Sequence, residues 1–334
     1  MKIREYKQDE TPPNKLVTLL RRNYGEGKNF NLFFNDFTKS FSFCANNENV
    51  LFHPFAGYVE EEMQAHIALI IDKRLPTGEA FFGFLEIPKE VSVFNEMWRV
   101  LTKKSKSLGI NILKGPVNGS IWHQYRCVKE TDESPFFKSE LPSISYYYNF
   151  LSSINPSLEV RYYSAYREKF DTTMQMIQIG YEKFTSLGFS IKEVKNMMAE
   201  DLQAIAALSK TIFRNNWGYT ELTGKEFLQL YSSEKLDAHL NKLYLLYKDK
   251  DIIGYCSTVK EDNSTIICKT IGLLPQYQGL GLGNALAYKV HFDAKKEGVG
   301  KIIYALIREG NQVKNFPKDD AVIFRRYAAF EFKI

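Results

Sequence analysis

The sequence has few cysteines, and none of them lie close together. The four are Cys44, Cys127, Cys256 and Cys268, and no two form a C-x-x-C motif. This scatter argues against a disulfide framework and against a zinc knuckle. We therefore expect reduced, mostly buried thiols and no metal cofactor.

Long hydrophobic runs are also missing. The longest apolar stretches, such as 67–71 and 81–85, are far shorter than the roughly 20 residues of a membrane-spanning helix. The first five residues include the charged Lys2, Arg4 and Glu5 and do not lead into the apolar core of a secretory signal. The sequence thus predicts no membrane span and a cytoplasmic location.

Charge of one sign is nowhere concentrated, although the formal net charge is +5. Basic tails that bind nucleic acid carry dense runs, so nucleic acid is not expected as a partner. A modest positive charge suits a polyanionic small ligand. With 334 residues, 44% hydrophobic and 25% charged, the composition predicts folded, water-soluble domains, and the length favours two of them.

The C-terminal half ends in a strand–loop–helix–strand unit. Its predicted elements are helices at 200–213 and 225–240, strands at 243–247, 252–259 and 265–274, a helix at 283–296 and a strand at 301–307. The N-terminal half contains a fainter copy of the last unit, with a strand at 81–87, a helix at 96–107 and a strand at 110–114.

The two copies share a glycine spacing. Gly83 and Gly109 are 26 positions apart, as are Gly272 and Gly298, so an offset of 189 superposes them. We interpret this as an internal duplication; the alternative is chance agreement of a common rhythm. The predicted domains are 1–168 and 188–334, joined by a connecting helix at 169–187.

A glycine loop, Gln278-Gly279-Leu280-Gly281-Leu282-Gly283, precedes the predicted helix 283–296. Such a loop exposes backbone N–H groups, and the helix dipole adds positive charge, so the pair is suited to a pyrophosphate. A dinucleotide G-x-G-x-x-G motif would need glycine at Asn284 or Leu286, and no Gly-Lys-Ser/Thr ending is present. Both rival phosphate loops are excluded.

The remaining pattern, Gln-x-x-Gly-x-Gly from Gln278 to Gly283 after Leu273-Leu274-Pro275, resembles the GNAT acetyltransferase superfamily. The resemblance covers 188–334 and is most specific at 273–286. It implies a mixed, mostly antiparallel sheet flanked by helices, and acetyl-CoA or another acyl-CoA as cosubstrate. The N-terminal half resembles the degenerate first domain of two-domain bacterial GNAT proteins.

Site residues follow from this resemblance. It implies that the amides of Gly279, Leu280, Gly281, Leu282 and Gly283, with Asn284, hold the CoA pyrophosphate and that Gln278 belongs to the same cofactor site. It further implies that backbone groups of Ile271, Gly272 and Leu273 pair with the pantetheine arm and that Asn311 contacts the lower pantetheine or the phosphates.

Catalytic residues are less well defined. Many family members carry a carboxylate on the strand before the loop, but residues 265–270 contain none. The family's leaving-thiol tyrosine, seven positions after the asparagine, is replaced by Lys318, and Tyr327 is the nearest candidate acid. Trp217 and Tyr219 are predicted to line the acceptor pocket; Trp217 as a core anchor and Tyr327 as a packed strand residue are the alternatives.

The offset of 189 places Glu90 and Phe94 where the second copy has loop glycines, so the N-terminal half is not expected to bind CoA. The predicted function is an acyl-CoA-dependent N-acyltransferase that acylates a small-molecule or peptide amine. Two alternatives stay open: a Fem-type transferase using aminoacyl-tRNA, and a catalytically silent binding protein. The acceptor and the oligomeric state are not predicted.

Overall fold

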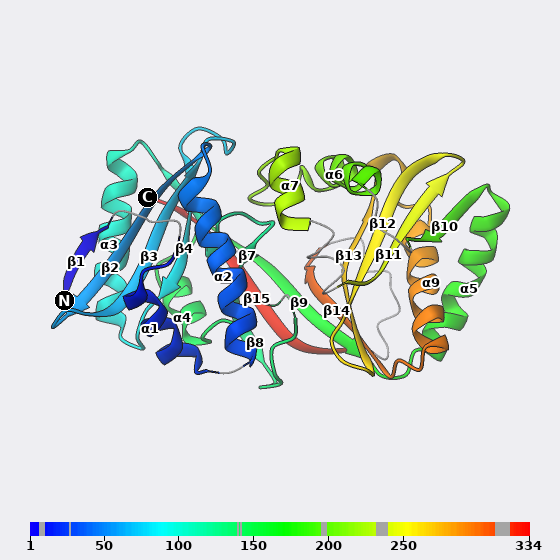
Figure 1. Ribbon diagram of the computed structural model, residues 1–334, viewed down its shortest axis with the longest axis horizontal. Coiled ribbons are helices and arrows are strands. Elements are labelled where there is room, and N and C mark those ends of the chain that lie inside the picture. Colours follow the sequence, from blue (N-terminus) through cyan, green and yellow to red (C-terminus); the bar gives the residue numbers. More distant parts are fainter. Residues whose placement is uncertain are drawn as a thin grey trace. The chain divides into compact units, whose positions relative to one another are not determined.

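The computed structural model describes the chain except for residues 7–10, 27, 139, 141, 195–198, 232–239 and 311–320. The described chain forms two compact units, whose elements are labelled in Figure 1. Unit 1 comprises Met1–Arg161, Trp217–Thr220 and Arg326–Ile334, and unit 2 comprises Tyr162–Asn216 and Glu221–Arg325. The predicted α/β class, with mostly antiparallel strands flanked by helices, is confirmed.

In unit 1 the strand order is β1-β2-β3-β4-β5-β15, and only β4 and β5 run parallel. Its elements are β1 (Lys2–Glu5), α1 (Asn14–Tyr24), α2 (Lys28–Asn46), β2 (Val50–Val59), β3 (Glu62–Asp72), β4 (Glu79–Glu86), α3 (Val91–Ser107), β5 (Ile112–Gly115), β6 (Val117–Asn118), β7 (Gln124–Tyr125), β8 (Cys127–Thr131), α4 (Tyr146–Ser153) and most of β15 (Val322–Lys333). Helices α1 and α3 both contact β3, which explains why the apolar run 67–71 is a buried strand.

Unit 2 repeats this arrangement with the order β9-β14-β13-β12-β11-β10, and only β13 and β14 run parallel. Its elements are the end of β9 (Leu158–Arg167), α5 (Asp171–Ser186), β10 (Phe189–Glu193), α6 (Ala199–Phe213), α7 (Gly224–Tyr231), β11 (Leu240–Lys248), β12 (Asp251–Lys260), β13 (Thr265–Leu273), the short 3-10 helix η1 (Pro275–Tyr277), α9 (Leu282–Lys296) and β14 (Lys301–Arg308). The predictions at 200–213, 283–296 and 301–307 are confirmed. The helix predicted at 225–240 ends at Tyr231 in the described residues, and Leu240 begins a strand.

The last strand of each sheet comes from a distant part of the chain. Residues 326–333 of β15 follow unit 2 in sequence but belong to unit 1, where residues 330–333 pair with β5. Residues 162–167 of β9 follow unit 1 in sequence but pair with β14 in unit 2. Each unit is therefore completed by a strand from a distant part of the chain. Helix α5 falls within the predicted connecting segment 169–187 and packs against α9 in unit 2 (Figure 1).

Strand register refines the duplication. Glu79 faces Ile112 across β4–β5, and Thr265 faces Lys301 across β13–β14, so the copies span 33 and 36 positions. The helix ends, Ser107 and Lys296, keep the offset of 189, so the three additional residues of unit 2 lie before the end of its helix. The predicted equivalence of Gly83 with Gly272 is therefore wrong, because the first strand is shifted by three residues.

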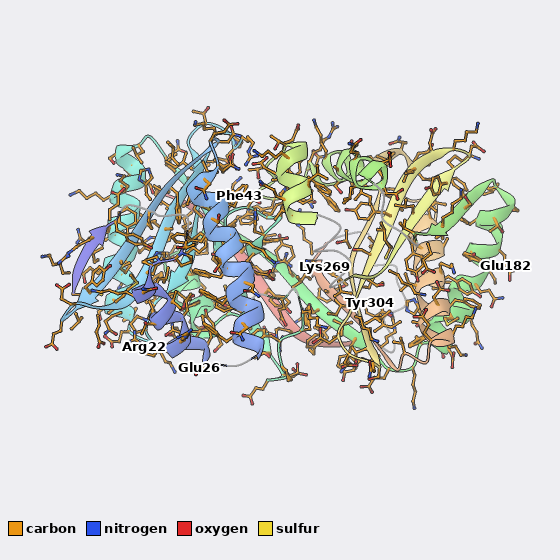
Figure 2. The ribbon with its side chains drawn as sticks, viewed as in Figure 1. Arg22, Glu26, Phe43, Glu182, Lys269 and Tyr304 are labelled. Atoms are coloured by element: carbon orange, nitrogen blue, oxygen red, sulfur yellow. The ribbon has the colours of Figure 1, made fainter. Side chains whose placement is uncertain are left out.

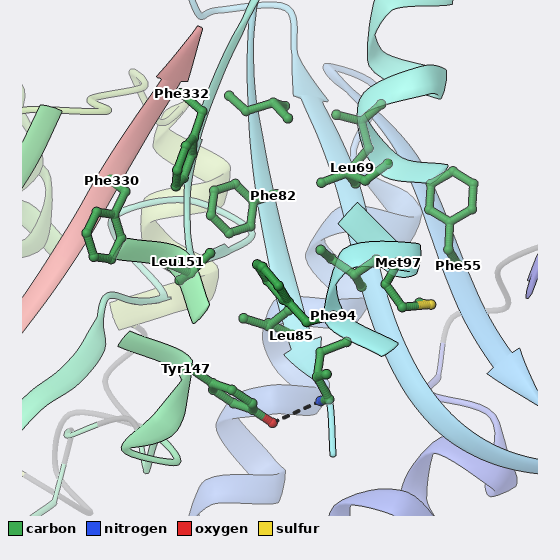
Figure 3. Packing of buried hydrophobic residues seen from close by; sticks show 14 of the residues in the cluster. Phe55, Leu69, Phe82, Leu85, Phe94, Met97, Tyr147, Leu151, Phe330 and Phe332 are labelled. Atoms are coloured by element: carbon green, nitrogen blue, oxygen red, sulfur yellow. Dashed lines mark hydrogen bonds between the residues drawn. The ribbon is translucent and has the colours of Figure 1, made fainter. Parts of the chain in front are cut away.

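Aromatic side chains form much of the core of unit 1 (Figure 3). Phe82, Phe94 and Tyr147 lie in one buried cluster, and each large side chain removed from water contributes about 1.5–3 kcal/mol. On α2, Phe37 and Phe41 pack against Phe84 of β4 with ring centroids 5.1 and 5.6 Å away. The aromatic runs 30–37 and 146–148 thus contribute to core packing.

A buried carboxyl group lies at the end of β4. Glu86 accepts hydrogen bonds from Asn23 (2.8 Å), Tyr24 (3.1 Å) and Tyr147 (3.3 Å). Burial raises the pKa of Glu86 to about 7, although these donors oppose the shift. Its neighbour across the sheet, His66, has its pKa lowered by burial to about 4. Folding therefore raises the pKa of Glu86 and lowers the pKa of His66.

These shifts predict a pH effect on the stability of unit 1. The contribution of Glu86, whose folded pKa is raised, is present below pH 4.5 and lost as pH rises through 7. The contribution of His66, whose folded pKa is lowered, is present above pH 6.5 and lost as pH falls through 4. As pH falls from 7 to 5, the contribution of Glu86 grows while that of His66 is lost, so the two cancel in the wild type. In Glu86→Gln only the His66 contribution remains, and the free energy of unfolding should fall by about 2 kcal/mol over this pH range.

Urea unfolding followed by tryptophan fluorescence measures this effect, because Trp98, Trp122 and Trp217 all belong to unit 1. The wild type should change little over the same pH range, and adding His66→Asn to Glu86→Gln should restore a flat profile. A Glu86→Gln variant whose stability does not fall between pH 7 and 5 would contradict the assignment.

Candidate acyl-CoA site

The glycine loop of unit 2 has left-handed backbone at two glycines. Gly279 and Gly281 have φ values of +79° and +80°, and a Cβ added at either position would have no neighbouring atom within 4 Å. Glycine is therefore required there by backbone conformation rather than by space. The Gln278 side chain donates a hydrogen bond to the Leu273 carbonyl (3.0 Å), which ties the loop to the end of β13.

Helix α9 begins at this loop and presents its amides outward. Gly281 is its N-cap, and the first backbone bonds run from Asn284 (3.0 Å) and Ala285 (3.4 Å) to the Gly281 carbonyl. The N–H groups of Leu282 and Gly283 precede these bonds, and the Leu282 side chain is buried in the core. With no acidic residue in its first turn, α9 offers a positive helix end to an anion.

Strands β13 and β14 part in the middle of the sheet. They pair from Thr265–Lys301 to Cys268–Tyr304 and, over the described strands, no further, although β13 continues to Leu273. On its other edge β13 stays paired with β12, with a bulge at Lys269. Residues 269–273 thus turn one backbone edge toward a gap, which we call the β13–β14 opening.

The strand between the vertex of the opening and the start of the loop is about as long as the pantetheine arm of CoA. From Cys268 to Leu273 is five residues of strand, which span about 17 Å. A pantetheine arm has a comparable length. The predicted pantetheine-binding residues Ile271, Gly272 and Leu273 lie along this stretch, between the glycine loop and the vertex of the opening.

The face of β13 at Gly272 is closely covered by α6. A Cβ at Gly272 would lie 3.1 Å from Ile212 Cγ2 and 3.5 Å from Phe213 Cζ. Its neighbours Ile271 and Leu273 instead pack with the cluster that includes Leu282 of α9. Helices on both faces therefore hold the free edge of β13 in position.

A hydrogen-bonded pair lies at the vertex of the opening. His291 Nδ1 is 2.6 Å from the Ala287 carbonyl, which can only accept, so this nitrogen donates. In the neutral ring Nε2 then accepts from the Tyr304 hydroxyl, 2.6 Å away. Arg167 Cζ lies 5.3 Å from the Tyr304 ring centroid. Figure 2 labels Tyr304 and the bulged Lys269. Sequence reasoning missed this pair; the signal was one histidine among the apolar positions of α9.

In unit 1 the parallel strands β4 and β5 also separate, and residues 117–118 lie between them. Strands β4 and β5 pair only from Glu79–Ile112 to Phe81–Lys114. Beyond them, the Phe84 amide donates to Asn118 Oδ1 at 2.6 Å. A Cβ at Gly83 would lie 2.0 Å from the Val117 carbonyl oxygen. The segment 117–118 of unit 1 thus occupies the position at which, among the described residues of unit 2, β13 and β14 no longer pair.

The remaining predicted site residues lie in different places. Asn311 lies outside the described residues. Trp217 is buried in unit 1 and donates from Nε1 to Glu331 (2.7 Å), while the Tyr219 ring packs edge-on against Trp122 (6.0 Å). Tyr327 is buried in unit 1 and its hydroxyl donates to Glu140. Their predicted roles stay predictions.

A surface pocket of about 450 Å³ lies beside the loop end of β13 in unit 2. It is lined by Ala204, Ala207, Leu208, Thr211, Lys250, Asp251, Ile252 and Leu274. Leu274 directly follows β13, so the pocket lies beside this end of β13 rather than at the vertex. The described side chains contain no cluster of three or more His, Cys, Asp or Glu suited to a metal ion, and no described helix is long and apolar enough to cross a membrane.

Comparison with known proteins agrees with this geometry. Residues 203–314 match the acetyltransferase (GNAT) family model. This part of the chain belongs to the GNAT family. No curated protein matches the chain in sequence. The GNAT domain includes β13, the glycine loop, α9 and β14, and therefore every described element of the opening.

Solved structures extend the GNAT fold to both units. A tandem GNAT protein from the clavulanic acid biosynthesis pathway has a TM-score of 0.60 at 9% identity and covers 99% of this chain and 98% of its own. A GCN5-related N-acetyltransferase from Kribbella flavida (TM-score 0.54, 10% identity) covers 98% and 71%. A probable N-acyltransferase of unknown function from Enterococcus faecalis V583 (TM-score 0.53, 11% identity) has the same coverage. These likenesses show that both units of the chain have the GNAT fold.

The loop predicts a charge-dependent effect on CoA binding. Asp and Asn both tolerate the left-handed backbone of Gly281 and have the same size. Gly281→Asp places a negative charge beside the pyrophosphate and should weaken CoA binding at least about tenfold relative to Gly281→Asn. Calorimetric titration measures both affinities, and the wild type should bind one CoA per chain.

The Gly281→Asn variant reports the cost of added bulk and backbone strain alone. Equal affinities of the Asp and Asn variants, with both folded, would show that the pyrophosphate does not lie at this loop. A wild-type stoichiometry of two would show that unit 1 also binds CoA.

Proposed function

We propose that the chain is an N-acyltransferase that uses acetyl-CoA, or another acyl-CoA, and acylates an amine by direct attack. The observation that carries this proposal is the β13–β14 opening, which lies one pantetheine length from a glycine loop at a helix N-terminus. The GNAT family membership of residues 203–314 supports the donor class.

In this proposal the amides of residues 279–283 hold the pyrophosphate, and the edge of 269–273 pairs with the pantetheine amides. The thioester then reaches the vertex, next to the bulge at Lys269. A bulge redirects backbone groups out of the ladder. An N–H at this point would donate to the thioester oxygen, and one such donor is worth about 3 kcal/mol in the transition state.

The reaction at the vertex is an acyl transfer. The amine nitrogen forms a bond to the thioester carbon, and the carbonyl oxygen becomes an oxyanion held by backbone donors. When the tetrahedral intermediate collapses, the carbon–sulfur bond breaks and the thiolate takes a proton. The nitrogen loses a proton, so an amide and free CoA are formed.

The amine must arrive neutral. For a lysine-like amine with a pKa near 10.4, deprotonation at pH 7 costs about 4–5 kcal/mol. Strand β13 carries no carboxylate, and Asp262, in the turn before it, is exposed with its pKa lowered by a hydrogen bond from the Ser264 amide. We therefore propose proton removal through water, or an acceptor amine of low pKa.

Two tyrosines are candidates for protonating the thiolate. Tyr327 is the candidate that the sequence predicts. Tyr304 is the phenol that lies at the vertex, and the charge of Arg167 over its ring would stabilise the phenolate left after proton transfer. We favour Tyr304, with His291 orienting its hydroxyl.

The acceptor is proposed only as a class, a small-molecule or peptide amine. Trp217 and Tyr219 stay its proposed contacts. A panel of polyamines, amino sugars, amino acids and short peptides, incubated with acetyl-CoA and longer acyl-CoAs, tests the function by mass spectrometry of the acylated products. Binding of CoA without any acylation would favour a silent binding protein, and failure to bind CoA would contradict the proposal.

Paired variants distinguish the acids once an acceptor is known. Tyr304→Phe should lower kcat about 100-fold with little change in the KM for acetyl-CoA, because the hydroxyl acts in the transition state. Tyr327→Phe should mainly lower stability, by about 1–3 kcal/mol, because it leaves buried Glu140 without this donor. A 100-fold fall in kcat for Tyr327→Phe alone would instead identify Tyr327 as the acid.

A further inference from the structure

Two cysteines face each other beside the β13–β14 opening. Cys256 of β12 and Cys268 of β13 have their sulfur atoms 3.7 Å apart. Cys256 is fully buried, whereas Cys268 is partly exposed. The other two cysteines, Cys44 and Cys127, are fully buried in unit 1. The contact between the two thiols is therefore specific to unit 2.

The register of β12 and β13 explains why the thiols meet. In the ladder, Cys256 is opposite Ile271 and Cys268 is opposite Thr258, with the bulge at Lys269 between these pairs. The two cysteines are thus diagonal neighbours on adjacent strands. Both side chains pack in the cluster that covers the α9 face of the sheet. Diagonal neighbours on one face of a sheet are close enough for their side chains to touch.

Hydrogen bonding makes the two thiols unequal. The hydrogen bond between the sulfurs raises the pKa of Cys256 and lowers the pKa of Cys268. Cys268 is thus the sulfur that ionises first, with the Cys256 thiol as its donor. Thiolate character and access to solvent are the two properties that make a cysteine react with oxidants.

We propose that Cys256 and Cys268 are a site of reversible oxidation, which closes to a disulfide when a peroxide attacks Cys268 and which weakens acyl-CoA binding when closed. The Cys268 thiolate attacks hydrogen peroxide, gives a sulfenic acid and releases hydroxide. The Cys256 sulfur then attacks the sulfenic sulfur, the S–S bond forms, and water leaves with the Cys256 proton. A dithiol reductant then reduces the disulfide to the two thiols and is itself oxidised to a disulfide.

Closing the bond requires the sulfurs to approach from 3.7 Å to about 2 Å. Cys268 belongs to the last residue pair before the opening, and the bulge follows it directly. Drawing Cys268 toward β12 therefore displaces the backbone edge that would pair with pantetheine. The effect on acyl-CoA rests on the proposed function, whereas formation of the disulfide does not.

Intact mass spectrometry and peptide mapping of the full chain after mild hydrogen peroxide test the first part. The wild type should lose two hydrogens, with the cross-link between the peptides of Cys256 and Cys268, and dithiothreitol should restore them. In Cys256→Ser the bond cannot close, so dimedone should label Cys268 as a sulfenic acid. In Cys268→Ser, dimedone should leave Cys256 unlabelled.

Calorimetry with CoA tests the second part. Oxidised wild type should bind CoA at least about tenfold more weakly than reduced wild type, and Cys256→Ser should show no such change after peroxide. Absence of the cross-link, or a cross-link through Cys44 or Cys127, overturns the site. An unchanged Kd in fully cross-linked protein overturns the effect on binding. Reduced protein that binds no CoA would instead contradict the proposed function and leave the mass result valid.

Discussion

The parting of two parallel strands is the constraint on which the site depends. Strands β13 and β14 share four residue pairs and then separate, while β13 stays paired with β12 along its other edge, across the bulge at Lys269. A backbone edge inside a sheet is normally satisfied by the next strand. Here the edge of 270–273 has no strand partner among the described residues, and the glycine loop and helix end that follow can hold an anion. The bulge, the thiol pair and the Tyr304–His291 pair all lie around this vertex.

The two units show two outcomes of the same parting. In unit 1 the chain itself supplies Val117 and Asn118, whose carbonyl and side-chain oxygens meet Gly83 and the Phe84 amide. In unit 2 the strand–helix segment is three residues longer and carries the glycine loop. Both units have thus kept the fold, but in unit 1 residues 117–118 close the parting, whereas among the described residues of unit 2 no strand pairs with the edge of 270–273.

Local patterns predicted much of this fold, because helical spacing, strand alternation and glycine turns are encoded by neighbouring residues. Helices α6 and α9 and the strands around the loop follow from such patterns. The strand exchange of β9 and β15 does not, because pairing partners far apart in sequence leave no local signal. The Tyr304–His291 and Cys256–Cys268 pairs depend on strand register and packing, which neighbouring residues do not encode. The glycine loop could be predicted from the sequence because Gly279 and Gly281 adopt a positive φ, which favours glycine at these positions.

The most direct test of the account is hydrogen–deuterium exchange with and without CoA, because it reads the backbone amides themselves. The account predicts that CoA slows exchange along 269–273 and 279–283 and leaves 82–87 of unit 1 unchanged. Protection along 82–87, or none along 269–273 at saturating CoA, would contradict the claim that the open edge of unit 2 is the acyl-CoA site.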